Sequence, residues 1–247
     1  MPIAATDLKL YGTANHAEND TATQGGAIST VKKLEFTQIA ANDDLEALSD
    51  NAGDTMNLTI TARSTAGAIV SETKALTGTT AAIFSTIGVV ERFLKAVLAS
   101  AATGTITIRR SVGGATVATL APGQTEARLV FYDAASESGS TTRYEKGFFK
   151  NEHGSLTLNS AAIKLTADPS AVIRVGSAPS KGDTATATNR KTAPASVTFV
   201  DDGVSQAIPT GALAAGETIG VWFELALAAD AAAAKSSLTV ELSGTTI

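Results

Sequence analysis

The two histidines come first in a search for chemistry, because general acid–base catalysis most often uses His. His16 lies in the polar N-terminal stretch YGTANHAENDTATQGGA, and His153 lies in KNEHGSL, which is typical of a turn before a strand. No G-x-S-x-G elbow or other nucleophile context accompanies either histidine. The chain has no Cys, which excludes a thiol nucleophile and Cys-ligated zinc. We therefore expect neither histidine to be catalytic, and we expect His153, at its turn, to be a solvated, hydrogen-bonding residue.

Two groups of acidic residues supply the clustered oxygen atoms that could bind calcium, and paired carboxylates could also serve a glycosidase. The first comprises Asn42 to Asp44 with Glu46, and the second comprises Asp201 and Asp202 before Gly203. Neither has the alternating ligands and final Glu of an EF-hand loop, and Asp commonly stabilises turns. A glycosidase pair usually comes with aromatic platforms. The single Trp222 lies in an apolar strand where burial explains it.

No glycine-rich segment has the context of a phosphate cradle. The GGAT at Gly113 and the GQT at Gly123 are typical of hairpin turns and lack the lysine of a P-loop. We therefore expect no catalytic, cofactor-binding or metal-binding residue, and no cofactor. The segment FYDAASESGSTTRYEKGFF carries several aromatics that either flank a loop that docks a partner or cover a thin core: Tyr132, Tyr144, Phe148 and Phe149.

The composition restricts the class of partner. The net charge is −5, with 19 Lys and Arg against 24 Asp and Glu, and no basic run exceeds two or three residues. Nucleic-acid binding depends on clustered Lys and Arg, so we expect no nucleic-acid partner. The N-terminus lacks the pattern of a signal peptide, and no apolar run approaches the roughly 20 residues of a membrane span. These features predict a soluble protein made in the cytoplasm, with no membrane partner.

Short alternating segments predict an all-β fold. In MNLTITARS, Met56, Leu58 and Ile60 fall on one face and Thr residues on the other, as in a half-buried strand. Similar strands recur with Gly, Pro, Asp and Asn between them, which favours antiparallel β-sandwiches. Two segments, residues 93–109 and 221–243, read as β-hairpins. DDLEALSD and AADAAAAKSS have helical turns as an alternative, and RFLKAVLA could be helical by propensity, although its short length between β segments favours a strand.

The chain is long enough for two sandwich units of about 100 residues each. We predict an extended N-terminal arm over residues 1–30, a first β-sandwich unit over residues 31–125 and a second over residues 126–247. The two predicted hairpins would then occupy equivalent places in two tandem sandwich or jelly-roll-like units. The alternatives are that they form the two ends of one larger unit, or that their likeness is chance. The arm is predicted because its Asn, Asp, Thr and Gly favour extended or loop conformation, and a frayed terminus is the alternative.

Three segments carry a resemblance to a known class of proteins. Residues 1–29 (MPIAATDLKLYGTANHAENDTATQGGAIS), residues 71–110 (SETKALTGTT to TITIRR) and residues 219–244 (IGVWFELALAADAAAAKSSLTVELSG) resemble tailed-bacteriophage virion structural proteins. The shared features are compositional and β-structural rather than catalytic. The resemblance implies a non-enzymatic virion component, made in the bacterial host, whose partners are other virion proteins and copies of itself.

Within that class the sequence leaves the location open. An arm with sandwiches favours a capsid decoration or cement protein, whereas tandem sandwiches also occur in tail, neck, collar or baseplate proteins. A carbohydrate-binding or adhesion module is the alternative outside the virion, and it would predict exposed aromatic platforms. Copy number, symmetry, neighbouring protein and host are not encoded in any motif of the chain.

Overall fold

The computed structural model describes residues 2–131, 138–167, 172–231 and 238–246 of the 247-residue chain. The fold is all-β: 53% of the chain lies in strands, and the described residues contain no α-helix. Residues 43–50, for which a helical turn was an alternative, contain strand β3 (Leu45–Ser49). Residues 232–237 of the second such stretch lie outside the described residues.

The chain divides into two compact units. Unit 1 comprises Met1–Ser29 and Asp133–Ile247, and unit 2 comprises Thr30–Tyr132. We predicted a boundary between the first and second β-sandwich units at residues 125–126. The observed boundary between unit 2 and the second segment of unit 1 lies nearby, at residues 132–133. Whether either range folds by itself stays a prediction.

Unit 2 has two groups of strands whose inner faces share one core. One group has the order β6-β3-β8-β9, and the other has the order β10-β7-β4-β5, with the last residues of β2 pairing in parallel with β10. Beyond β3, their bounds are β2 (Gln24–Lys33), β4 (Asn57–Ser64), β5 (Ile69–Ala75), β6 (Ala82–Ile83), β7 (Val90–Leu98), β8 (Ile106–Arg110), β9 (Thr116–Leu120) and β10 (Glu126–Arg128).

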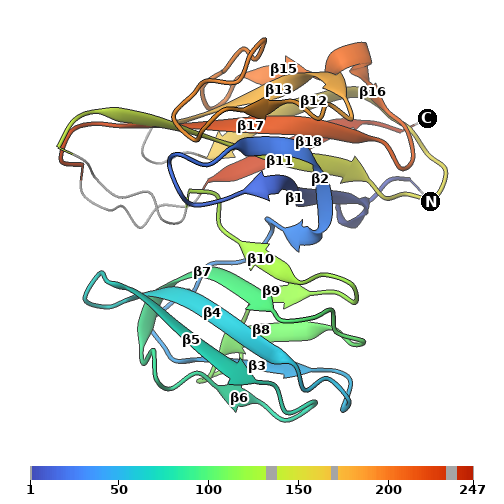
Figure 1. Ribbon diagram of the computed structural model, residues 1–247. Helices are drawn as coiled ribbons and strands as arrows, with labels where there is room; N and C mark the ends of the chain where they lie inside the picture. The colour runs from blue at the N-terminus through green and yellow to red at the C-terminus, as the bar shows by residue number, and fades with distance from the viewer. Residues whose placement is uncertain (1, 132–137, 168–171, 232–237, 247) are drawn as a thin grey trace. The chain divides into compact units, whose positions relative to one another are not determined.

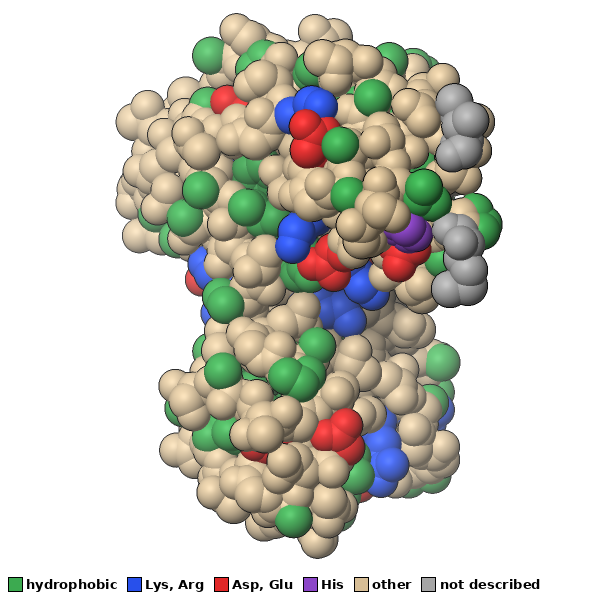
Figure 2. All heavy atoms as spheres, turned by 90° about the vertical axis from the view of Figure 1, so that its right-hand side faces the viewer, with side chains coloured by type: hydrophobic (Ala, Val, Ile, Leu, Met, Phe, Trp, Pro, Cys, Tyr) green, Lys and Arg blue, Asp and Glu red, His purple; other side chains and the backbone are tan. Residues whose placement is uncertain are grey.

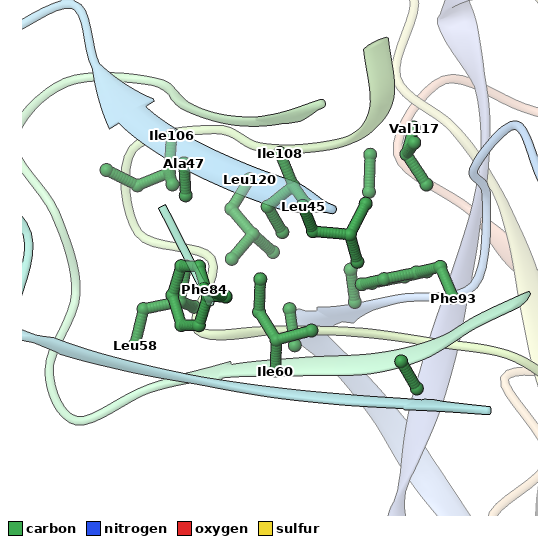
Figure 3. Close-up of a cluster of buried hydrophobic side chains, with 14 of the residues drawn as sticks. Leu45, Ala47, Leu58, Ile60, Phe84, Phe93, Ile106, Ile108, Val117 and Leu120 are labelled. Carbon is green, nitrogen blue, oxygen red and sulfur yellow. The ribbon is translucent and has the colours of Figure 1, made fainter. Parts of the chain in front are cut away.

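The core of unit 2 follows from the alternation of its strands. Leu58, Ile60 and Ala62 are buried on one face of β4, while Asn57 and the threonines between them point away from the core. Figure 3 shows Leu58 and Ile60 opposite a set of aliphatic side chains from the facing strands, namely Leu45, Ile106, Ile108 and Leu120. The predicted face of β4 is therefore confirmed.

Unit 1 is built around the long pairing of two strands, β11 (Thr141–Asn151) and β17 (Thr218–Leu227). Their antiparallel register runs from Thr141 opposite Leu227 to Lys150 opposite Thr218. The sheet order here is β13-β17-β11-β1-β2, with β14 paired to β2, and a second group of strands pairs with β12. The remaining bounds are β1 (Leu8–His16), β12 (Leu158–Ala167), β13 (Ile173–Lys181), β14 (Thr186–Ala187), β15 (Ser205–Ala207), β16 (Ala212–Leu213) and β18 (Thr239–Thr245).

The prediction of an extended arm over residues 1–30 is wrong. Strand β1 pairs with β11 from Leu8 opposite Asn151 to Tyr11 opposite Phe148, and Figure 1 shows β1 (blue) among the strands of that sheet. Leu10 and Tyr11 are buried. The polar composition misled the prediction because these few apolar side chains, together with backbone pairing, are enough to fix the segment in the sheet.

The two predicted hairpins are also wrong, although their four strands exist. Strand β7 pairs with β4 and β10, whereas β8 pairs with β3 and β9. Likewise β17 pairs with β11 and β13, whereas β18 pairs with β12. In both places the connection therefore crosses between two groups of strands. Alternation determines which face of a strand is buried but does not determine which strand pairs with it.

Candidate functional site

The densest group of ionisable side chains in unit 1 surrounds Glu145 in the middle of β11. The Glu145 side chain is 0% exposed. Its carboxylate accepts a hydrogen bond from the Arg190 guanidinium, and its Oε2 lies 3.1 Å from Nε2 of His16. Arg190 also donates from Nη1 to the carbonyl of Glu18 over 2.7 Å. Three segments that are distant in the sequence therefore meet at one buried carboxylate.

The same group extends outward through Asp20. The Arg143 guanidinium binds the Asp20 carboxylate with two hydrogen bonds, from Nε to Oδ1 over 2.8 Å and from Nη2 to Oδ2 over 3.0 Å. Lys191 Nζ lies 3.1 Å from the second oxygen. The Arg143 hydrogen bonds, with the contribution of Lys191, lower the pKa of the Asp20 carboxyl to about 2. We call His16, Asp20, Arg143, Glu145 and Arg190 the Glu145 cluster.

The Glu145 cluster is arranged to hold segments together. Both His16 and Glu145 side chains are fully buried, whereas an acid or base must reach the proton that it transfers. The pairing between these two residues spans 129 positions of the chain. The buried Glu145 carboxylate is paired with the buried Arg190 guanidinium, as buried charges must be to offset their desolvation. His16 is therefore a buried residue of strand β1 rather than part of a polar arm, and no sequence motif pointed to Glu145 or Arg190.

Lys146, the next residue of β11, is held in a second buried group. Its Nζ donates to Oδ2 of Asp183 over 2.8 Å, and to the carbonyls of Asp183 and Ala185 over 2.8 and 3.3 Å. The ammonium also lies 4.8 Å from the ring centroid of Phe148 and 5.5 Å from that of Trp222, distances suited to cation–π contact. Burial lowers the pKa of the Lys146 ammonium below its usual value, and the hydrogen bond and charge of Asp183 offset only part of this shift.

The aromatic residues of this region line buried surfaces of the sheet. Trp222 is 1% exposed, which confirms the prediction that burial explains it. Tyr144 is buried with its ring centroid 5.6 Å from that of Phe199, and Phe148 and Phe149 are buried as well. These three aromatics therefore cover the core rather than flank a docking loop. Tyr132 lies outside the described residues.

The first of the two acidic groups forms ion pairs with a neighbouring strand, whereas the second lies exposed at a turn. Asp43 and Glu46 pair with arginines of β8: Arg110 Nε lies 3.1 Å from Asp43, and Arg109 Nε lies 2.6 Å from Glu46. Asp201 and Asp202 are exposed at a turn. Within the described ranges, no group of three or more His, Asp or Glu residues is placed to hold a metal ion.

His153 lies in a turn, as predicted. Its Nδ1 accepts hydrogen bonds from the backbone N–H groups of Ser155 and Leu156, over 3.2 and 3.0 Å. The ring therefore stabilises the turn that leads into β12, in the manner in which Asn and Asp side chains commonly close turns.

A buried carboxylate that the sequence did not single out is Asp54 in unit 2. It accepts hydrogen bonds from the Ser49 hydroxyl over 2.6 Å and from the backbone N–H groups of Thr103 and Gly104, each over 2.9 Å. These hydrogen bonds, led by that of Ser49, lower the pKa of the Asp54 carboxyl. Asp54 thus ties the turn after β3 to the loop before β8.

Unit 2 also has a shallow depression of about 310 Å³ beside β9, lined by Lys33, Glu35, Phe36, Thr37 and Thr116–Thr119. The segment from Lys33 to Thr37 occupies the neighbouring strand edge, since Thr37 N donates to the Val117 carbonyl over 2.8 Å. Lys33 Nζ donates to the Thr119 hydroxyl over 3.1 Å. The depression therefore lies between β9 and the segment from Lys33 to Thr37 that runs along the edge of this strand.

Charged side chains of both signs lie on the face shown in Figure 2. On the face shown in Figure 2, blue and red side chains lie next to one another among uncharged atoms, and no extended field of one sign is visible. The most exposed large apolar side chains are scattered along the described chain: Val31, Ile69, Ile83, Val89, Val112 and Val204.

Comparisons with known proteins find no family model, no curated protein and no solved structure that matches the chain. Among the described residues, no helix has the length and apolar character needed to cross a membrane.

Proposed function

We propose that this chain is a non-enzymatic structural component of a tailed-phage virion that binds the capsid surface as a decoration protein. The proposal starts from the resemblance of residues 1–29, 71–110 and 219–244 to such proteins. Its main structural support is the use of buried ionisable side chains: His16, Glu145 and Lys146 bind separate segments of the chain to one sheet.

Buried side-chain contacts that join distant segments suit a protein that serves as a rigid structural component of a particle. A virion protein contributes many copies of the same contact, so each contact is weak by itself and symmetry multiplies its effect. A rigid surface loses little conformational entropy when it binds, which favours assembly. Within this proposal, units 1 and 2 are two β-sandwich units, and the shared core of unit 2 supports that finer description.

The copy number of the chain in purified particles tests the proposal. Quantitative mass spectrometry against the major capsid protein should find a few hundred copies, as expected for a protein that follows the capsid symmetry. Immunogold labelling should then place the chain on heads. A copy number of about a dozen, or labelling of tails, would instead indicate a tail, neck, collar or baseplate component. Absence from particles would overturn the proposal.

A binding experiment separates capsid decoration from carbohydrate recognition. Purified protein should sediment with particles that lack it, and it should show no binding on a glycan array. A Trp222→Ala variant is a poor probe here because Trp222 is buried. The better control is the protein unfolded in denaturant and then rapidly diluted, which should not sediment with particles. Binding to a defined glycan without binding to particles would support the adhesion module instead.

A further inference from the structure

Strand β5 ends its sheet, and its outer edge is open. Among the described strands, the order β10-β7-β4-β5 leaves β4 as its only neighbour, with an unbroken antiparallel register from Asn57 opposite Ala75 to Arg63 opposite Ile69. The strand has neither a proline nor a bulge. An edge of this kind is a template on which another strand can pair.

The hydrogen bonds of β4 and β5 show which backbone groups face outward. Leu76 N donates to the Met56 carbonyl, and Ser64 N donates to the Ala68 carbonyl. In antiparallel pairs, alternate residues bond to the neighbouring strand, so the even-numbered residues of β5 face β4. Ile69, Ser71, Thr73 and Ala75 therefore direct their N–H and C=O groups outward, and within the described residues no hydrogen bond reaches them.

The charged residues of β5 do not shield this edge. Natural proteins commonly protect an open edge with projecting charges, especially lysine. Here Lys74 Nζ donates to the Ile83 carbonyl over 2.6 Å, and Glu72 Oε2 accepts the backbone N–H groups of Thr86 and Ile87. Both side chains are thus held against their own chain. Ile69 in the strand and Ile83 beside it remain 53% and 45% exposed.

We propose that the β5 edge pairs with β5 of a second copy of this chain, antiparallel and about a two-fold axis at Thr73. In this register Thr73 lies opposite Thr73 as a hydrogen-bonded pair, which agrees with its outward backbone groups. Glu72 then lies opposite Lys74 of the second copy, and Lys74 lies opposite Glu72. These are non-hydrogen-bonded positions, where Cα atoms are about 4.5 Å apart and side chains are closest.

The charges select both the second copy and the register. A two-fold axis at Glu72 or at Lys74 would place identical charges opposite each other, which is destabilising. An axis at Ser71 would place Glu72 opposite Val70 and form no charge pair. Only the axis at Thr73 gives two opposite-charge pairs. Each group keeps bonding capacity for them, because a carboxylate has a second oxygen and an ammonium has three N–H donors.

Disulfide trapping tests the register directly, because the chain has no Cys of its own. In a Thr73→Cys variant the two Cα atoms would lie about 5.5 Å apart, within the span of a disulfide. Mild oxidation should therefore convert most of the protein to a covalent dimer on a non-reducing gel. Ile69→Cys is the matched control from the same exposed face of β5. Its two thiols would lie about 27 Å apart, so it should remain monomeric. Equal cross-linking of both variants, or none at Thr73→Cys, would overturn the proposal.

Charge exchange gives a second, independent test in solution. Sedimentation equilibrium of the wild-type chain should show a monomer–dimer equilibrium. Glu72→Lys and Lys74→Glu should each weaken the dimer by about tenfold or more, because each variant places like charges at two positions. The double variant Glu72→Lys/Lys74→Glu restores both opposite-charge pairs and should recover dimerisation. Circular dichroism melting confirms that each variant is folded.

A wild-type chain that stays monomeric at every concentration, or a folded double variant that dimerises no better than the single variants, would overturn the proposal. These results do not depend on the virion role, because they concern the purified chain alone. Loss of particle binding by a chain that still dimerises would count against the proposed function and leave this inference intact.

Discussion

The ammonium of Lys146 lies 2.8 Å from Oδ2 of Asp183, and it is enclosed by two carbonyl oxygens and two aromatic rings. The lysine belongs to β11 at the centre of unit 1, whereas Asp183 follows β13. A single buried cation therefore attaches the segment before β14 to the sheet that carries Trp222.

Removing Asp183 should leave this cation without its counter-ion. We expect Asp183→Ala to lower the free energy of unfolding by about 3 kcal/mol, because an uncompensated buried charge is costly. Lys146→Met together with Asp183→Ala removes both charges and should recover much of the loss. Guanidinium denaturation followed by Trp222 fluorescence measures both variants. A double variant less stable than Asp183→Ala alone would show that the charge pair itself is strongly stabilising.

Asp20 should make stability depend on pH in the acid range. Its pKa is about 2 in the folded chain and 3.8 ordinarily, so the folded state holds the ionised form more strongly than the unfolded state. This contribution is fully present above about pH 4 and is lost as the pH falls through about 2. Its size is about 2 kcal/mol. The stability difference between wild type and Asp20→Asn should be largest near neutral pH and should fall steeply as the pH approaches 2, vanishing only below it. A constant difference would contradict the assignment.

Trp222→Ala should destabilise unit 1 by about 3–5 kcal/mol, because it opens a large cavity in a buried site. Val204→Ala is the control in the same unit, since Val204 is exposed, and its effect should stay below about 0.5 kcal/mol. Circular dichroism follows both unfolding transitions, because the first variant lacks the fluorescent residue. A loss below about 1 kcal/mol would mean that the site collapses around the smaller side chain.

Two features require a glycine at position 25. One is its backbone conformation, and the other is the close approach of neighbouring atoms to the place that a Cβ would occupy. Its φ is +88°, and a Cβ there would lie 2.9 Å from both the Ala185 carbonyl oxygen and the Trp222 ring. Gly216, with φ +78° and nothing within 4 Å, is matched in conformation but open in space. We expect Gly216→Ala to cost about 1 kcal/mol and Gly25→Ala to cost about 1–3 kcal/mol more. Equal losses in thermal denaturation would show that only the backbone conformation matters.

Deleting residues 1–29 should abolish the cooperative unfolding of unit 1, because the deletion removes β1 and every contact described for the Glu145 cluster except the Arg190–Glu145 hydrogen bond. Trp222 is the only tryptophan and lies in unit 1, so its fluorescence reports on that unit alone. Deletion of residues 2–6, which precede β1, is the control and should leave the transition nearly unchanged. An unaltered Trp222 transition in the longer deletion would restore the idea of an independent arm.

The sequence by itself determined the fold class and many buried faces. Alternation in β4 located Leu58 and Ile60 on the inner side, and the apolar run around Trp222 indicated its burial. These features are local, because in a strand successive side chains point to opposite faces whatever lies beyond them. The turn at His153 was predictable for the same reason, since it depends on residues only two or three positions away.

Only the tertiary structure decided which strands pair and which charges meet. Strands β7 and β8 follow one another in the sequence yet pair with different partners. Strand β1 pairs with β11, so that Leu8 lies opposite Asn151 although the two residues are far apart in the sequence. His16 and Glu145 are 129 positions apart, so no spacing in the sequence indicates their contact. Such choices depend on the total packing and hydrogen bonding of distant segments, whereas local patterns set only the face that each segment buries.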